Sequence, residues 1–154
     1  MKISKKTDYA LRALMTLVEF DRHGPVPIRE LAHRNQAPKR FLEHILLELK
    51  AKGWVRSMAG IKGGYLLAKR PTQITLGEVV RHFDGLLAPV ACVSVSSYER
   101  CNQEPVCRFR RIFLNSRNYV TDLMDQATLA AVFQGTPVSA QEVFDPEFIG
   151  GEGI

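Results

Sequence analysis

The 154-residue chain has no run of apolar residues approaching the ~20 that a helix needs to cross a membrane. It opens with Met-Lys-Ile-Ser-Lys-Lys-Thr-Asp, which lacks the apolar stretch of a secretory signal. Cysteine is scarce, and an odd number, three, argues against the disulfide framework of a small secreted domain. We therefore expect a protein of the reducing cytoplasm with no membrane partner.

The sequence also lacks the patterns that enzymes carry. No paired acid and base, nucleotide-binding loop or nucleophile motif stands out, and there is no internal repeat or low-complexity tract. We therefore expect no catalytic residues. The length and a hydrophobic fraction of 45% fit one compact domain, with room for an appended element.

Positive charge is concentrated in the first half of the chain. Residues 1–70 carry 15 Lys and Arg against 6 Asp and Glu, a net charge of +9. Residues 71–154 carry 6 against 10, a net charge of −4. This division favours one region that meets a polyanion such as nucleic acid and one that does not, although a solvated basic surface would give the same count.

All three cysteines fall within one short segment, at Cys92, Cys101 and Cys107, spaced C-x8-C-x5-C. Three thiolates on a loop form a soft, anionic cage that suits an iron–sulfur cluster or zinc. Three ligands are one short of a closed site, so a fourth ligand or an open position is implied, as a sensor would use. The alternative is three ordinary thiols, one or two of them buried as small apolar residues.

The apolar spacing of residues 7–20 predicts a helix with a broad buried face, capped by Ser4 or Thr7. A short helix over 29–34, a tight turn at 35–37 and a helix from Pro38 to about Lys52 form a helix-turn-helix. Strands over 54–57 and 64–68, joined by a glycine-rich turn, follow as a wing.

The fold class that we predict is mainly α with a small β-hairpin wing. Residues 1–70 form the winged helix-turn-helix, residues 71–133 the cysteine loop and dimerisation region, and residues 134–154 a flexible tail. Thr75 caps a helix over 76–83, and Thr128 caps a short helix before Gly135.

A long amphipathic helix is expected over roughly 106–127. Little else in the chain is left to cover its apolar face, so a second copy of the chain is the expected partner, with Phe109, Ile112, Phe113, Val120, Leu123 and Met124 at the interface. A two-fold dimer fits palindromic double-stranded DNA. The alternative is that this helix folds back on its own winged region.

The residues expected to contact DNA differ in role. Lys39, Arg40 and Glu43 open the second helix of the motif, where side chains reach base edges in the major groove. In the wing, Arg56 or Lys62 reaches the minor groove or phosphate. Lys2, Ser4 and Lys5 lie along the phosphate backbone and add salt-dependent affinity. For each charged residue the plainer alternative is a solvated surface charge.

Six short segments, together with their order, resemble the IscR/NsrR type of bacterial transcription regulator, also called the Rrf-two family. The segments are Thr-Asp-Tyr-Ala-Leu-Arg-Ala-Leu at 7–14, Phe-Leu-Glu-His-Ile-Leu at 41–46, Gly-Gly-Tyr-Leu-Leu at 63–67, Ile-Thr-Leu-Gly-Glu-Val-Val at 74–80, the cysteine loop, and Thr-Leu-Ala at 128–130. The resemblance covers residues 1 to about 133. It implies a homodimeric winged-helix repressor or activator whose cysteine loop holds an iron–sulfur cluster near the dimer interface.

The resemblance also bears on the fourth ligand. IscR-like members often carry a histidine shortly after the third cysteine, whereas Arg110 stands there in this chain. NsrR-like members use a carboxylate near the start of the first helix of the partner subunit, and Asp8 occupies that motif position. Asp8 also has a plain role as a first-turn carboxylate at a helix N-terminus. His33 is the other outside candidate, with a surface position as its plainer alternative.

On resemblance alone, a 4Fe–4S cluster is favoured over a 2Fe–2S cluster. Family members without a cluster also exist, and these would regulate through thiol chemistry, a small molecule or a protein partner. An iron–sulfur protein that performs redox chemistry is the alternative from a different class.

Overall fold

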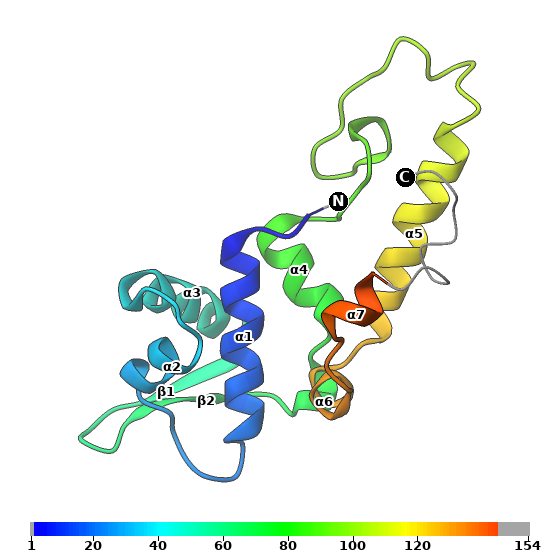
Figure 1. Ribbon diagram of the computed structural model, residues 1–154. Coiled ribbons are helices and arrows are strands. Elements are labelled where there is room, and N and C mark those ends of the chain that lie inside the picture. The colour runs from blue at the N-terminus through cyan, green and yellow to red at the C-terminus, as the bar shows by residue number, and fades with distance from the viewer. Residues whose placement is uncertain (1, 145–154) are drawn as a thin grey trace.

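The computed structural model describes residues 2–144 and is mainly helical, with one antiparallel hairpin (Figure 1). Its helices are α1 (Lys5–Glu19), α2 (Ile28–Arg34), α3 (Lys39–Ala51), α4 (Leu76–Asp84), α5 (Arg110–Gln126), α6 (Leu129–Gln134) and α7 (Ala140–Val143). The hairpin strands are β1 (Val55–Met58) and β2 (Gly64–Leu67), and two 3-10 helices are η1 (Pro71–Gln73) and η2 (Ala91–Val93). The predicted fold class is confirmed. No described helix has the length and apolar character that crossing a membrane requires.

Helix α1 is the centre of the core and packs against α2, α3, α4, α6 and β2. Ala10, Ala13, Leu14 and Leu17 recur at helical spacing on its buried face and are at most 2% exposed. Burial of a side chain such as Leu14 contributes about 1.5–3 kcal/mol. Ser4 caps the helix by accepting a hydrogen bond from the Thr7 backbone N–H at 3.2 Å, as one of the two predicted caps.

The turn between α2 and α3 is fixed by a buried polar side chain. The Asn35 amide donates to the Leu31 carbonyl at 2.8 Å and to the Thr16 hydroxyl at 3.0 Å. Gln36 follows in the left-handed region with φ +48°. Pro38 is the N-cap rather than the first helical residue, because its ψ of 122° lies outside the helical region.

The wing is a short hairpin anchored to the segment before α2. Val55 pairs with Leu67 and Met58 with Gly64. The Val26 N–H donates to the Tyr65 carbonyl, and the Val26 carbonyl accepts from the Tyr65 N–H, both at 2.9 Å. A Cβ at Gly64 would collide with the Val26 carbonyl, so glycine permits this close pairing of backbones.

After the wing, the chain forms α4 and later α6, and both helices pack against α1. Thr75 caps α4 in a capping box with Glu78, and Thr128 caps α6, both as predicted. A backbone bridge joins Thr75 to Thr128, which places Leu129 in the core with no exposed surface. Helices α4 and α6 therefore share one core with the winged region.

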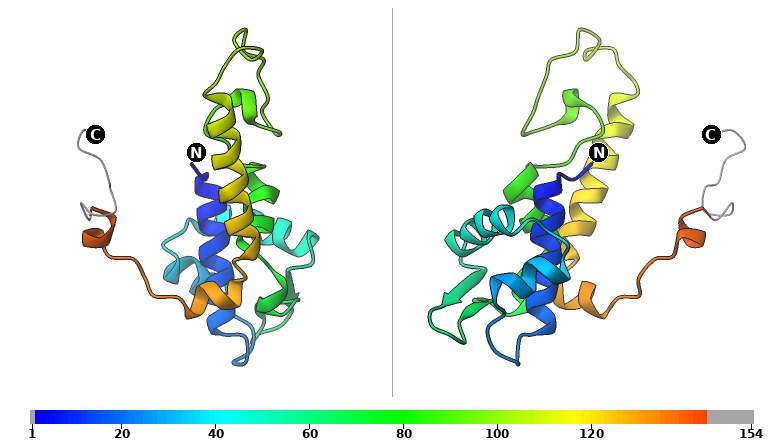
Figure 2. Two further views of the ribbon diagram at one scale, coloured as in Figure 1. Left: turned by 90° about the vertical axis from the view of Figure 1, so that its right-hand side faces the viewer. Right: turned by 60° about the vertical axis from the view of Figure 1, so that its left-hand side comes forward.

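Helix α5 and the loop before it extend away from this core. The cysteine loop and the hairpin lie at opposite ends of the molecule in every view (Figures 1 and 2). After α6 the chain runs outward to α7, as the left view of Figure 2 shows. Of the expected flexible tail over 134–154, residues 145–154 lie outside the described residues.

Candidate functional site

The first turn of α3 presents the residues predicted to read DNA. Leu42, Ile45, Leu46 and Leu49 bury the opposite face of the helix without exposed surface, which fixes the outward face. On that outward face Lys39 and Arg40 are exposed and Glu43 is half-buried. The Lys39 ammonium lies 3.7 Å from the Glu43 carboxylate, one helical turn away.

The wing carries exposed charge and one exposed apolar residue. Arg56 and Lys62 are exposed, and Lys62 lies in the turn that Gly60 forms with φ +108°. Ile61, beside Lys62, has its whole side chain in solvent. An open, basic tip of this kind is accessible to a nucleic-acid groove.

The basic N-terminal residues lie at the other end of α1 from the hairpin (Figure 1). Lys2 and Lys5 are exposed. Ser4 is engaged in the fold, because its side chain caps α1 and its backbone N–H donates to the Asp84 carboxylate at 2.8 Å. Burial raises the pKa of Asp84, but its hydrogen bonds with Ser4 and Thr7 outweigh that effect and hold the pKa below its ordinary value.

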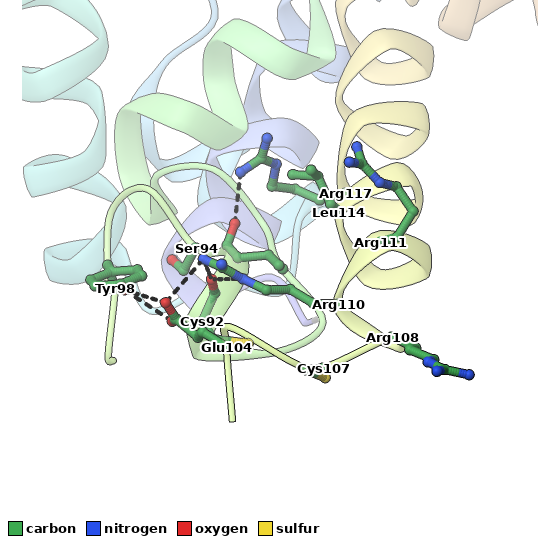
Figure 3. A pocket seen from close by; sticks show the side chains of 11 residues that line it. Cys92, Ser94, Tyr98, Glu104, Cys107, Arg108, Arg110, Arg111, Leu114 and Arg117 are labelled. Atoms are coloured by element: carbon green, nitrogen blue, oxygen red, sulfur yellow. Dashed lines mark hydrogen bonds and ion pairs between the residues drawn. The ribbon is translucent and has the colours of Figure 1, made fainter. Parts of the chain in front are cut away.

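The cysteine loop joins α4 to α5, and between the loop and α5 lies an open cavity of about 500 Å³ (Figure 3). Cys92 and Cys107 line this cavity, while Cys101 is exposed elsewhere on the loop. All three thiols are free. Within residues 2–144, no three Cys, His, Asp or Glu side chains lie close enough together to hold one metal ion.

Two arginines of α5 hold the backbone of the loop. Arg110 donates from Nε and Nη2 to the Cys92 carbonyl at 3.2 and 2.9 Å. Arg117, two turns further along the helix, donates to the Val93 carbonyl at 2.7 Å. These two contacts fix η2, with Cys92 in it, against α5. Arg108 and Arg111 also line the cavity.

An acidic side chain joins the two limbs of the loop. The Tyr98 hydroxyl donates to the Glu104 carboxylate at 2.9 Å, the Cys101 N–H donates to it at 3.3 Å, and Arg110 Nη2 lies 3.4 Å from it. Burial raises the pKa of Glu104, but these hydrogen bonds and the charges of Arg110 and Arg100 outweigh it, so the pKa lies below its ordinary value. The hydrogen bond to Glu104 raises the pKa of Tyr98.

The donor set of the loop fits an iron–sulfur cluster chemically. Thiolates are the ligands that such clusters take, and a cluster held by three thiolates and a carboxylate is anionic. Four arginines that line the cavity of Cys92 and Cys107 would offset the charge of such a cluster. The backbone of one cysteine is already fixed by Arg110.

Asp8 lies in the first turn of α1, at a separate surface hollow that Lys2, Lys5 and Asp84 also line. Its carboxylate accepts from Arg12 Nε at 2.9 Å and lies 3.9 Å from the Lys5 ammonium. Asp8 is not gathered with the cysteines of its own protomer. His33 is exposed on α2, which lies on the other side of α1 from the cysteine loop (Figure 1).

The long helix begins later than expected, at Arg110, and none of its residues is buried in the described chain. One face packs on α4, where Val120 and Met124 line a groove with Val80. Arg81 of α4 binds both carboxylate oxygens of Asp125, at 2.6 and 2.8 Å.

The other face of α5 carries an exposed apolar stripe. Phe109 is 74% exposed, Ile112 64% and Leu123 58%, and Tyr119 is exposed on the same stripe, whereas Phe113 is 36% exposed and lies two turns before Val120, at the edge of the side that faces α4. Of the six residues predicted at a dimer interface, four are therefore exposed, and two face α4 of their own protomer. Tyr119 was missed by sequence reasoning, although its spacing from Ile112 and Leu123 matches the stripe.

The imidazole of His82 links α4 to the helix-turn-helix. Its ring packs edge-on against Trp54 at 5.6 Å between ring centroids, and Nε2 lies 3.9 Å from the Glu48 carboxylate of α3. This Nε2 is buried without a hydrogen-bond partner in the described residues. Glu48 in turn forms an ion pair with Lys6 of α1 at 2.7 Å.

The comparisons with known proteins agree with this architecture. Residues 3–135 match the model of the Rrf2 family, which is described as an iron-dependent transcriptional regulator. A protein of Rhodobacter capsulatus, named as an HTH-type transcriptional regulator rrf2-like, is 43% identical over 133 residues, which cover 82% of this chain and 89% of the relative. The HTH-type transcriptional regulator NsrR of Bacillus licheniformis is 31% identical over 129 residues, covering 84% and 90%.

Among solved structures, that of CymR (YrzC), the global cysteine regulator of B. subtilis, is similar to this chain. It superposes with a TM-score of 0.75 at 28% identity and covers 89% of this chain and 99% of the other.

Proposed function

The chain belongs to the Rrf2 family of transcriptional regulators, which are not enzymes, and on that premise we propose that it is a homodimer that senses through an iron–sulfur cluster and binds a palindromic operator. The cluster is held by Cys92, Cys101 and Cys107, with Asp8 of the partner subunit as the fourth ligand. A 4Fe–4S cluster is favoured over a 2Fe–2S cluster. The signal is redox state, nitric oxide or iron supply.

The geometry of α3 and the wing supports the DNA-binding part. Lys39 and Arg40 stand on the exposed face of α3, with the hydrophobic core holding the other face. Arginine there forms a bidentate contact with guanine, and Glu43 accepts from a cytosine amine. Arg56 and Lys62 in the wing bind the minor groove or phosphate, and Lys2 and Lys5 add contacts to the backbone.

The cluster part is carried by one observation: Cys92 and Cys107 share a cavity lined by four arginines. When bound, a cluster there supplies a group that oxidants, nitric oxide or loss of iron can alter. Cys101 lies on the same loop and is exposed, so it reaches the site by a movement of the loop rather than of the core. Among soft thiolates, a hard carboxylate is the weakest ligand and the first to be displaced.

The dimer part is supported by the exposed stripe of α5. Phe109, Ile112 and Leu123 remain largely exposed after the chain has folded. A second copy of α5 covers this stripe and brings the α1 of one subunit near the loop of the other. The release of Asp8 then alters the N-terminus of α1 and shifts the two recognition helices relative to each other.

A second candidate function follows from the free thiols. Cys101 is exposed and unpaired by any disulfide, and CymR, which shares the fold, is named as a regulator of cysteine. A regulator without a cluster would respond through oxidation of this thiol, or through a small molecule or protein partner.

The test is purification without oxygen, followed by iron and sulfide analysis, visible spectroscopy and gel shift on operator DNA. We expect a brown, iron-containing protein, and we expect each single Cys→Ala variant to lose most of its iron. Asp8→Ala should keep the cluster at first and lose it faster, whereas Glu19→Ala, at the far end of the same helix, should behave as the parent. Apo-protein and cluster-loaded protein should differ in operator affinity at fixed salt.

An iron-free parent protein would contradict the cluster and favour the thiol-based regulator. Equal operator affinity of apo-protein and loaded protein would show that the cluster is not the switch. Either result would leave the winged helix-turn-helix as the DNA-binding part.

A further inference from the structure

Glu104 connects parts of the cysteine loop that are distant from one another along the chain. Its carboxylate accepts two hydrogen bonds from the early limb of the loop, from the Tyr98 hydroxyl at 2.9 Å and from the Cys101 N–H at 3.3 Å. It also lies 3.4 Å from Arg110 Nη2, in the first turn of α5. With only 14% of its side-chain surface exposed, Glu104 is held among these partners.

Arg110 extends this connection to another cysteine. Its guanidinium donates two hydrogen bonds to the Cys92 carbonyl and reaches Glu104 with the same Nη2 (Figure 3). The backbones of Cys92 and Cys101, nine residues apart, are thus joined through one ion pair. A planar guanidinium suits this arrangement because its donors are fixed in one plane.

We propose that Glu104 is a positioning residue of the cysteine loop. Through Tyr98, the Cys101 amide and Arg110, it joins the backbones of Cys92 and Cys101 to the first turn of α5 before any cluster is present. This proposal rests on the proposed function only for its consequence for the cluster: once Cys101 has moved to the site, the link that Glu104 makes between the loop and Arg110 slows the release of iron and sulfide. The positioning itself is a property of the apo-protein.

The contacts argue against Glu104 as an iron ligand in this arrangement. Tyr98 donates to both carboxylate oxygens, at 2.9 Å each, and Arg110 and the Cys101 amide occupy the same group. A carboxylate bound by so many donors orients its neighbours, as outer-shell carboxylates do in metal sites.

The first experiment uses the apo-protein and needs no metal. Glu104→Gln keeps the shape and an acceptor for Tyr98 but removes the charge that Arg110 pairs with. Because charge-assisted hydrogen bonds are about twice as strong as neutral ones, we expect amide hydrogen exchange over residues 98–107 and alkylation of the half-buried Cys92 thiol to rise about three- to tenfold. Glu99→Gln, the same change at an exposed residue of the same loop, is the matched control.

Tyr98→Phe should raise loop exchange by a smaller factor, and the Tyr98→Phe, Glu104→Gln double variant should add little to Glu104→Gln, because the two residues act as one unit. The melting temperature of the whole protein should stay the same, since the core is untouched. Loop exchange and alkylation in Glu104→Gln equal to those in Glu99→Gln would overturn the proposal.

The second experiment follows cluster release into a chelator. We expect Glu104→Gln to lose its visible absorption about three- to tenfold faster than the parent and Glu99→Gln, and equal release rates would overturn the consequence for the cluster. If the parent carries no iron, the proposed function fails, and the exchange and alkylation measurements still decide the role of Glu104.

Discussion

The winged region and the α5 region of this protein are held together by different forces. Leu14, Ile45 and Leu129 have no exposed surface, and they join α1, α3 and α6 in a continuous apolar core. In α5, by contrast, no residue is buried within the described chain. This helix is held by half-buried apolar contacts of Val120 and Met124 with α4, by the Arg81–Asp125 ion pair and by arginines that donate to loop carbonyls.

The difference indicates which of the two regions buries its apolar side chains within one protomer. A core of fully buried leucines stabilises the winged region without help from a partner. The stripe of Phe109, Ile112 and Leu123 leaves large apolar side chains in water, which monomeric proteins rarely do over a contiguous patch. This exposed stripe supports the proposed pairing of α5 with a second copy of the chain.

The largest effect is expected where the core is deepest. Leu46→Ala should lower the free energy of unfolding by about 2–5 kcal/mol, because it leaves a cavity beneath α3. Its neighbour Leu47 is 59% exposed, so Leu47→Ala should change stability far less. Denaturant unfolding of both variants at one protein concentration measures the contrast. Equal losses of unfolding free energy in the two variants would contradict the burial of Leu46 on the inner face of α3.

A second prediction addresses assembly. Leu123→Glu should raise the dimer dissociation constant about a hundredfold, since a carboxylate would be buried without a partner. The fold of the protomer should survive, because Leu123 is 58% exposed within it. Sedimentation together with circular dichroism separates the two properties. Asn115→Glu, an exposed position on the same helix, is the control. A parent protein that sediments as a monomer would defeat the interpretation of the stripe.

The third prediction concerns DNA binding, which we propose for the winged region. Arg40→Ala should cost about 1–3 kcal/mol at the operator and relax specificity at one position in each half-site. Lys62→Ala should weaken binding to all sequences more evenly and reduce the salt dependence. Fluorescence anisotropy with operator and unrelated DNA measures both. Unchanged operator affinity in Arg40→Ala would contradict the major-groove role of α3.

The smallest expected effect lies at the contact of α4 with α3, where His82 is half-buried beside Glu48. Burial first, and then the charge of Lys52, lower the pKa of His82 below 6.5; Glu48 raises it in part, and Lys6 lowers it further. The unfolded chain therefore binds the additional proton, and stability that is present above pH 6.5 is lost as the pH falls through the folded-state pKa.

Replacement of His82 by Phe should remove part of this loss of stability between pH 6.5 and 5. The free energy of unfolding, measured across that range, shows the change as a flatter pH profile. His33→Phe, at an exposed position, should leave the profile of the parent. A parent protein that gained stability on acidification would have the opposite sign and would exclude this linkage.

The parts that sequence predicted well depend on short-range rules. Ser4, Thr75 and Thr128 cap helices because a side-chain oxygen reaches the N–H three residues on, a fixed local distance. The hairpin and the helix-turn-helix follow from apolar spacing and glycine turns. Their existence was predictable, and their ends shifted by only one or two residues.

The parts that sequence missed depend on where a loop places its side chains. The contacts of Glu104 with Tyr98 and Arg110 span a segment without periodicity, so spacing gave no signal for them. Sequence placed the apolar residues Val120 and Met124 on the long helix, but apolar character alone does not tell whether α4 or a second copy packs against them. Only the path of the chain decides that.

The contact of Gly77 with Asp125 gives α5 the mechanics of a lever. A Cβ at Gly77 would collide with the Asp125 carboxylate, so α4 and α5 are in close contact at the C-terminal end of α5. The cysteine loop is joined to the N-terminal end of α5. At 1.5 Å per residue the 17 residues span about 25 Å, so a tilt of about 5° at the base carries the loop through about 2 Å. Conversely, a displacement of the loop by about 2 Å would rotate α5 by a few degrees about its contact with Gly77.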